Sequence, residues 1–136
     1  MHWAAQYIGK PYEEGARGPD TFDCWGLLRA VYTDRYKIEL PTLPGISTES
    51  VLGIHREIVN CMTHDWLTSF DPKDGYAVAM SQSHTWHHVG IYVEADGCKI
   101  LHCWDKQSVV IDTMRTLELR GMHKMSFFKH RLWPIS

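Results

Sequence analysis

Apolar residues recur at helical spacing in the first half of the chain. Residues 24–32 are the clearest case, because their apolar side chains fall at intervals of three and four residues and predict a helix with one buried face. Thr21 or Asp23 is placed to cap its start. Similar spacing predicts a short first helix over 3–8 and a third helix over 51–62. The face of the central helix consists of Cys24, Leu27, Leu28, Val31 and Tyr32.

The second half alternates between apolar and polar residues, with the period of two that is typical of β-strands. Ala95-Asp96-Gly97 predicts a hairpin turn within this half. Helices followed by antiparallel strands predict an α+β fold, in which helices pack on a mostly antiparallel sheet of about five or six strands. Because no repeat or linker divides the chain, we expect one domain over residues 1–136. The expected strands cover 76–80, 88–94, 98–104, 108–113 and 125–133.

Composition and charge narrow the classes of function. The formal net charge of −2 comes from 14 basic and 16 acidic residues, which are spread along the chain, so nucleic acid is not an expected partner. The N-terminal residues lack the pattern of a signal peptide, and no apolar run has the roughly 20 residues of a membrane helix. We therefore expect a protein that is made in the cytoplasm and has no membrane span. The irregular spacing of the four cysteines predicts reduced thiols.

The position of Cys24 suits a nucleophile. A thiol attacks a carbonyl carbon as the thiolate, and the dipole and unpaired N–H groups of a helix start lower the pKa of a thiol. Because Cys24 is expected in the first turn of its helix, its pKa is expected to be lowered. An inert buried cysteine is the competing interpretation, since cysteine is among the most frequently buried residue types.

A cysteine nucleophile also requires a base and a group that orients the base. In the strand 88–94, His88 and Gly90 are expected on the face that points away from the core. The hairpin turn brings His102 of the next strand within cross-strand reach of His88, beside the space that the glycine leaves. Two neighbouring imidazoles provide a base and its orienting partner, although a single strand histidine is more often only a satisfied or exposed residue.

Four short blocks of sequence follow one another between residues 3 and 104. They are Gly9-Lys10-Pro11-Tyr12, Phe22-Asp23-Cys24-Trp25-Gly26-Leu27, His88-Val89-Gly90-Ile91-Tyr92 and Ile100-Leu101-His102. In order and spacing these blocks resemble the NlpC/P60 family of papain-like cysteine peptidases. The resemblance implies a papain-like fold and hydrolysis, without a cofactor, of an amide bond in a bacterial peptidoglycan stem peptide. The bond that it implies joins D-γ-glutamate to a diamino acid, and the reaction passes through a thioester.

The resemblance also implies a role for individual residues. It implies Cys24 as the nucleophile, His88 as the general base and His102 as the polar residue that orients the base. Tyr12 is expected near the oxyanion, and Asp23 and Trp25 flank the nucleophile on the side of the oxyanion and the substrate. Trp25 stands where the family commonly has a serine, so a bulkier rim beside the thiol is expected.

Three other interpretations stay open. A zinc site would draw on His84, His87 or Cys103 in addition to the two strand histidines. Adjacent residues of a strand point to opposite faces, which argues against such a site, and no metal is expected. The chain could instead be a catalytically silent structural or plugging protein with the same fold. It could also be an acyltransferase, which differs from a hydrolase only in the acceptor of the acyl group.

The short single-domain form with its Asp-Cys-Trp-Gly block is similar to the phage tail-associated members of the family. This similarity implies a protein that is assembled in the host cytoplasm into a phage tail tip and carried by the virion to the bacterial cell wall. The expected partners are therefore the stem peptide, as substrate, and other tail-tip proteins.

Overall fold

The structure, a computed structural model, describes residues 2–13, 15–16, 18–41, 59–60, 64–82, 88–103 and 107–133. The first elements are a 3₁₀ helix (Trp3–Gln6), helix α1 (Cys24–Val31) and a π-helical turn (Tyr32–Tyr36). The later elements are β1 (Trp66–Ser69), β2 (Ala77–Ser81), β3 (His88–Glu94), β4 (Cys98–Cys103), β5 (Val109–Thr113), α3 (Met114–Leu119) and β6 (Lys124–His130). The helices, apart from the short α3, precede the strands, and this arrangement confirms the α+β fold class.

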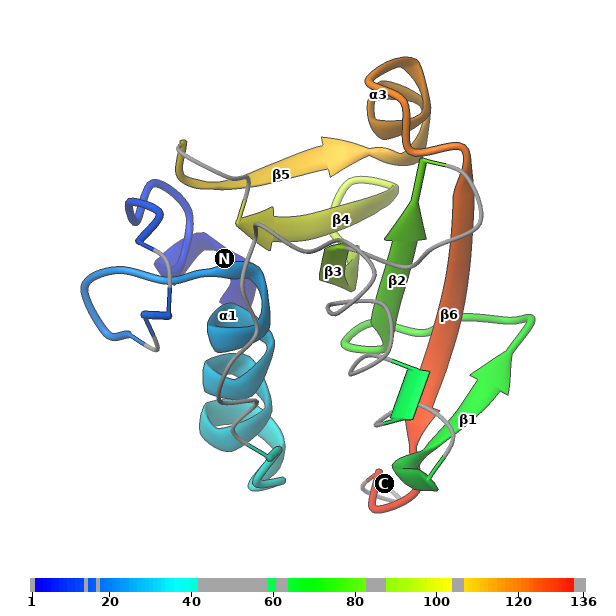
Figure 1. Cartoon of the computed structure of the whole chain (residues 1–136), viewed down its shortest axis with the longest axis horizontal. Helices are drawn as coiled ribbons and strands as arrows, with labels where there is room; N and C mark the ends of the chain where they lie inside the picture. The colour runs from blue at the N-terminus through cyan, green and yellow to red at the C-terminus, as the bar shows by residue number, and fades with distance from the viewer. Residues whose placement is uncertain are drawn as a thin grey trace.

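The strands form a six-stranded sheet in the order β1-β6-β2-β3-β4-β5, and every neighbouring pair is antiparallel. Strands β2 to β5 lie side by side in chain order, whereas β6 returns to pair with the outer side of β2 (Figure 1). The turn between β3 and β4 is the predicted hairpin, in which Ala95 N–H donates to the carbonyl of Gly97 at 3.0 Å. Asp96 and Gly97 both have positive φ values, of 54° and 104°, as such tight turns require.

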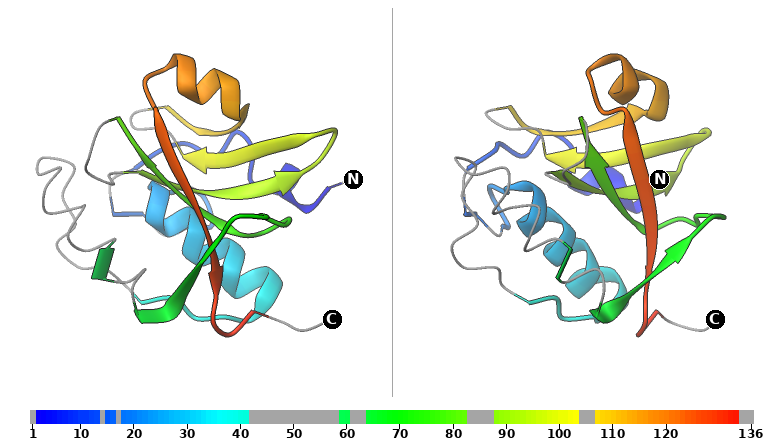
Figure 2. Two further views of the ribbon diagram at one scale, coloured as in Figure 1. Left: turned by 90° about the vertical axis from the view of Figure 1, so that its right-hand side faces the viewer. Right: turned by 45° about the vertical axis from the view of Figure 1, so that its right-hand side comes forward.

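Helix α1 places Cys24 at its first position. Asp23 is the N-cap, and its Oδ1 accepts a hydrogen bond from the backbone N–H of Gly26 at 2.6 Å. Of the two predicted caps, Asp23 is therefore the one that the helix uses, and not Thr21. The helix continues into the π-helical turn and ends before Lys37, whose φ of 57° lies in the left-handed region. Figure 2 shows α1 packed beside the sheet.

Two buried clusters occupy the two faces of the sheet. In β3, Val89, Ile91 and Val93 belong to the cluster that includes the apolar face of α1. Tyr92 belongs to the second cluster, to which Leu117 of α3 contributes. As a result, all of β3 except its last residue is buried. A polar side chain on either face of this strand needs a hydrogen-bond partner inside the protein.

Some element boundaries differ from the sequence predictions. The first helix is a single 3₁₀ turn, and the strand predicted over 125–133 begins at Lys124 and ends at His130. Neither β1 nor α3 was predicted, because four and six residues are too few to display a repeating pattern. The third helix, predicted over 51–62, falls almost entirely outside the described residues.

Candidate active site

Cys24 lies where a loop is attached to the start of α1, and its thiol is buried although part of the residue is exposed. Asp23 joins the two segments, because its Oδ1 caps Gly26 and its Oδ2 accepts a hydrogen bond from Gly15 N–H at 3.0 Å. The backbone N–H of Asp23 donates to the carbonyl of Ala16 at 3.1 Å. Any side chain at Gly26 would collide with this carbonyl oxygen. The loop and the first turn of the helix therefore form one rigid support for the cysteine.

The thiol of Cys24 lies at the start of β3. The backbones of Val89, Trp25 and Cys24 itself form hydrogen bonds with Sγ that act to lower its pKa. Burial has the largest influence and acts in the opposite direction, as does the Asp23 carboxylate, so the pKa of Cys24 is raised from 9.0 to about 12. The lowered pKa expected from the helix start is therefore wrong in net direction, because loss of hydration outweighs the backbone donors. The resting group at neutral pH is the thiol.

Three side chains from neighbouring strands form a line of hydrogen bonds. His88 Nε2 of β3 lies 2.9 Å from His102 Nδ1 of β4, and His102 Nε2 lies 2.9 Å from Asp112 Oδ2 of β5. The two imidazole rings meet edge to face, with an interplanar angle of 85°. His102 is fully buried and His88 is 7% exposed. The predicted cross-strand contact between the two histidines is confirmed.

The register of the sheet accounts for this line. His102 pairs with Val110 of β5, and Asp112 lies two residues further along β5 on the same face. Gly90 leaves the space that the neighbouring strand occupies: a Cβ there would lie 2.8 Å from the carbonyl oxygen of Leu101 and 3.1 Å from Cβ of His102. Of the two uses expected for the space at Gly90, another chain segment or the substrate, the neighbouring strand β4 is the one that occupies it.

The surroundings of His102 favour its neutral form. Burial has the largest influence and lowers its pKa, whereas the hydrogen bond and the charge of Asp112 raise it. The charge of Arg120, which follows α3, also acts to lower it. The net result is a pKa below the ordinary value of 6.5, so the ring is neutral at pH 7.

Asp112 is the residue of this line that sequence reasoning missed. It lies within the strand predicted over 108–113, but its partner depends on the register between β4 and β5. The signal that the sequence offers is one acidic residue in an otherwise apolar or hydroxyl-bearing strand, Val109-Val110-Ile111-Asp112-Thr113. A charged residue in a strand that packs against a buried neighbour needs a partner, and the nearest polar candidate on that neighbour is His102.

The aromatic residues expected beside the nucleophile differ in their exposure. Tyr12 is half-buried in the loop, pairs with Phe22 in a short β-bridge and packs against the same cluster as Cys24. Trp25 is only 5% exposed, and its Nε1 donates to the carbonyl of Pro41 at 2.8 Å. The structure thus places the indole in the core and not on an exposed rim, because burial of the ring is favourable once its N–H has a partner.

Of the other candidate ligands, Cys103 is the one that the structure describes. His84 and His87 lie outside the described residues, and the buried Cys103 donates its thiol hydrogen to the carbonyl of Phe22 at 3.1 Å. Within the part of the chain that the structure describes, no group of three His, Cys, Asp or Glu residues is arranged to hold a metal ion. Over the same ranges, no helix is both long enough and apolar enough to cross a membrane.

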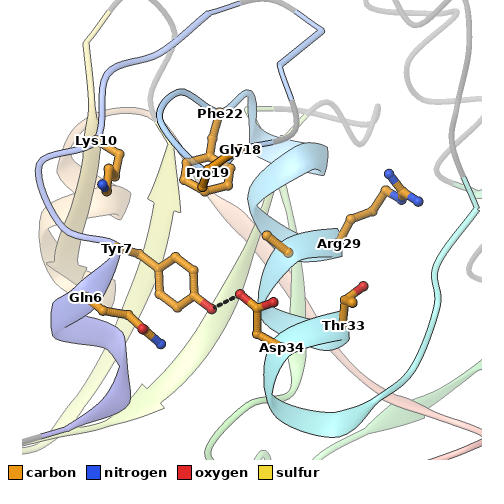
Figure 3. Close-up of a pocket in the computed structure, with 10 residues that line it drawn as sticks. Gln6, Tyr7, Lys10, Gly18, Pro19, Phe22, Arg29, Thr33 and Asp34 are labelled. Carbon is orange, nitrogen blue, oxygen red and sulfur yellow. Dashed lines mark hydrogen bonds between the residues drawn. The ribbon is translucent and has the colours of Figure 1, made fainter.

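A cavity of about 430 Å³ lies between the N-terminal 3₁₀ helix and α1 (Figure 3). Tyr7 stands on one side, and its hydroxyl donates to Asp34 Oδ2 at 2.8 Å, which links the two helical segments. Pro19 and Phe22 line the cavity at the end nearer the loop. Neither the thiol nor the line of hydrogen-bonded side chains borders this cavity.

The chain is similar to known proteins in sequence and in fold. A family model described as the NlpC/P60 family matches residues 9–126. The fold is similar to that of the NlpC/p60 domain of peptidoglycan hydrolase SagA, with a TM-score of 0.61, 19% identity and 91% of each chain covered. It is also similar to a lipoprotein-like protein of the NLP/P60 family from Staphylococcus aureus, with a TM-score of 0.59 and 20% identity.

The second of these similarities covers 97% of this chain but 39% of the Staphylococcus aureus chain, so this chain corresponds to one part of that longer protein. No curated protein matches the chain. At such low identities the solved structures show the shared fold. The family model matches the loop, α1 and most of the sheet, with Cys24, His88 and His102 among the matched residues. The chain therefore belongs to the NlpC/P60 family.

Proposed function

We propose that the protein is a cysteine peptidase that hydrolyses an amide bond in peptidoglycan stem peptides. The observation that carries this proposal is the hydrogen-bonded pair of His88 and His102, which starts one residue from the Val89 backbone that contacts the thiol of Cys24. Membership of the NlpC/P60 family and the fold shared with a peptidoglycan hydrolase support a hydrolase of the cell wall. From the family resemblance, the proposed bond joins D-γ-glutamate to a diamino acid.

The first half of the proposed reaction transfers the acyl group to the enzyme. Cys24 Sγ attacks the carbonyl carbon of the amide while the thiol proton passes to His88. The tetrahedral oxyanion then collapses, the C–N bond breaks and His88 delivers the proton to the leaving amine. This step leaves a thioester between Cys24 and the acyl half of the substrate.

The second half restores the enzyme. A water molecule attacks the thioester carbon and gives one proton to His88. The C–S bond breaks, the new carboxylic acid leaves and the proton returns from His88 to Sγ of Cys24. Backbone N–H groups at the start of α1, together with the nearby Tyr12, are the donors that we assign to the oxyanion in both halves.

The raised pKa of Cys24 bears on how the attack begins. Because burial raises this pKa to about 12, the thiolate is scarce at neutral pH. Attack therefore depends on transfer of the proton to His88 during the step and not on a thiolate formed beforehand. We therefore expect replacement of His88 to reduce the rate of the reaction strongly.

The proposal is tested with a soluble stem peptide that contains a γ-D-glutamyl-diamino acid bond, with the products identified by mass spectrometry. We expect two fragments whose masses sum to that of the peptide plus one water. Cys24→Ala and His88→Ala should each reduce cleavage by at least about 100-fold. Cys98→Ala is the matched control, because Cys98 is an exposed thiol at the start of β4, outside the site, and should leave cleavage unchanged.

Two results would overturn the proposal, and each favours an alternative. If the parent protein leaves the peptide intact and the Cys24 thiol resists iodoacetamide until the chain is denatured, the protein is a catalytically silent member of the family. If the acyl half is transferred to an added amine in preference to water, the protein is an acyltransferase.

A further inference from the structure

Asp112 determines where His102 carries its proton. An ionised carboxylate only accepts hydrogen bonds, so the 2.9 Å contact with Asp112 Oδ2 requires an N–H at His102 Nε2. A neutral imidazole has one N–H, which makes Nδ1 of the same ring an acceptor. The neutral form is the one that the burial of His102 favours. The side chain on β5 thus selects one of the two tautomers on β4.

The same reasoning extends to His88. Because Nδ1 of His102 is an acceptor, the 2.9 Å contact requires the N–H of His88 to be at Nε2. A neutral His88 then has its lone pair on Nδ1, and this nitrogen is the one able to take a proton. In the reversed arrangement, with each proton on the other nitrogen, the two rings would still be hydrogen-bonded, but Nδ1 of His88 would carry a proton and could not act as a base.

We propose that Asp112 is a positioning residue that sets the direction of the hydrogen-bonded line, so that a neutral His88 keeps its lone pair on Nδ1, the nitrogen that would take the proton of Cys24. The catalytic consequence rests on the proposed function, whereas the placement of the two ring protons does not. The other two side chains of the line are imidazoles, which accept either direction. The carboxylate cannot donate, so it makes the two directions unequal.

Asp112 has a second effect, which comes from its negative charge and is separate from the direction of the line. When the site takes up a proton, the carboxylate of Asp112 stabilises the positive charge on the pair of imidazoles. Arg120 opposes this stabilisation at His102. The charges of Asp112 and Arg120 both act on His102, which lies against β3 and β5. Without the carboxylate, the paired histidines hold a proton less tightly, and the acidic limb of a pH–rate profile moves to lower pH.

The proton positions are measured directly by NMR of ¹⁵N-labelled histidine side chains at neutral pH, with single histidine variants used to assign the signals. In the parent protein we expect His102 and His88 each to be protonated at Nε2 and bare at Nδ1. In Asp112→Asn the amide can accept or donate, so the reversed tautomers should become populated. Asp112→Glu restores a carboxylate and should restore the parental tautomers, and Glu118→Gln on the exposed side of α3 is a control that should change nothing.

Peptide cleavage supplies the second readout. At pH 7 we expect Asp112→Asn to lower kcat/KM by about 10- to 100-fold, mainly through kcat, because substrate contacts are unchanged. The acidic limb of its pH profile should move down by roughly 1 pH unit. Asp112→Glu should recover a substantial part of both effects. A purely structural role for Asp112 would reduce the amount of folded protein without moving the pH profile.

The two readouts separate failure of this inference from failure of the proposed function. Parental tautomers that persist in Asp112→Asn, or a parent protein with His102 protonated at Nδ1, would overturn the role of Asp112 whatever the activity. Parental proton positions as expected, combined with cleavage that survives Cys24→Ala, would overturn the peptidase mechanism and leave the inference about Asp112 intact.

Discussion

Asp23 links the stability of the site to the reactivity of its thiol, and two substitutions separate these effects. Its carboxylate accepts hydrogen bonds from Gly26 N–H at 2.6 Å and Gly15 N–H at 3.0 Å. Its charge also acts to raise the pKa of Cys24. Asp23→Asn keeps an oxygen for the helix cap but loses the charge and the second acceptor oxygen. Asp23→Ala loses the charge and both acceptors.

The expected magnitudes follow from these contacts. An N-cap hydrogen bond contributes about 1–2 kcal/mol, and the second bond, on an exposed loop, contributes about 0.5–1 kcal/mol. We therefore expect Asp23→Ala to lower the free energy of unfolding by about 2 kcal/mol and Asp23→Asn to lower it by less than about 1 kcal/mol. Both variants should lower the pKa of Cys24 from about 12, because both remove the negative charge beside it.

Stability is measured by urea unfolding followed by tryptophan fluorescence. Thiol reactivity is measured as the rate of alkylation of Cys24 by iodoacetamide over pH 7 to about 11, with the labelled peptide quantified by mass spectrometry. Asp20→Asn is the matched control, since Asp20 lies exposed in the same loop and should alter neither quantity. Equal losses of stability in Asp23→Asn and Asp23→Ala, or slower alkylation of Cys24 in Asp23→Asn at a given pH, would refute this account of Asp23.

Gly90→Ala inserts a Cβ 2.8 Å from the carbonyl oxygen of Leu101 and 3.1 Å from Cβ of His102. We expect it to lower the free energy of unfolding by about 1–3 kcal/mol in urea and to change the histidine ring signals, and unchanged stability would contradict this expectation. Cys103 has a pKa raised by burial from 9.0 to about 12, so the folded chain keeps this proton after the unfolded chain has lost it. Its contribution to stability is complete below pH 9 and falls by about 1.4 kcal/mol per pH unit between the two values. Cys103→Ser should flatten this decline in urea unfolding at alkaline pH, and a slope like that of the parent would show that Cys103 is not its source.

Local patterns were sufficient to predict the elements that carry the site. The cap at Asp23 and the apolar face of α1 depend on residues within two helical turns, and the hairpin between β3 and β4 depends on Asp96 and Gly97. A tight hairpin sets the register of the strands that it joins, which is why the contact between His88 and His102 could be predicted from the sequence. Strand β1 and helix α3 were not predicted because such short elements contain too few residues to display a repeating pattern of apolar positions.

What the sequence alone determined, then, was the class of fold, the family, the contact between two histidines and a cysteine at a helix start. Three features were decided only by the tertiary structure: Asp112 as the partner of His102, the raised pKa of Cys24 and the burial of the Trp25 ring. The contact between Asp112 and His102 depends on the register between β4 and β5. The sequence predicts no tight turn between these two strands that would set this register. The other two depend on how much water the assembled core excludes. A helix start has the same dipole in any fold, but desolvation is a property of everything packed around the group, and at Cys24 it is the larger influence.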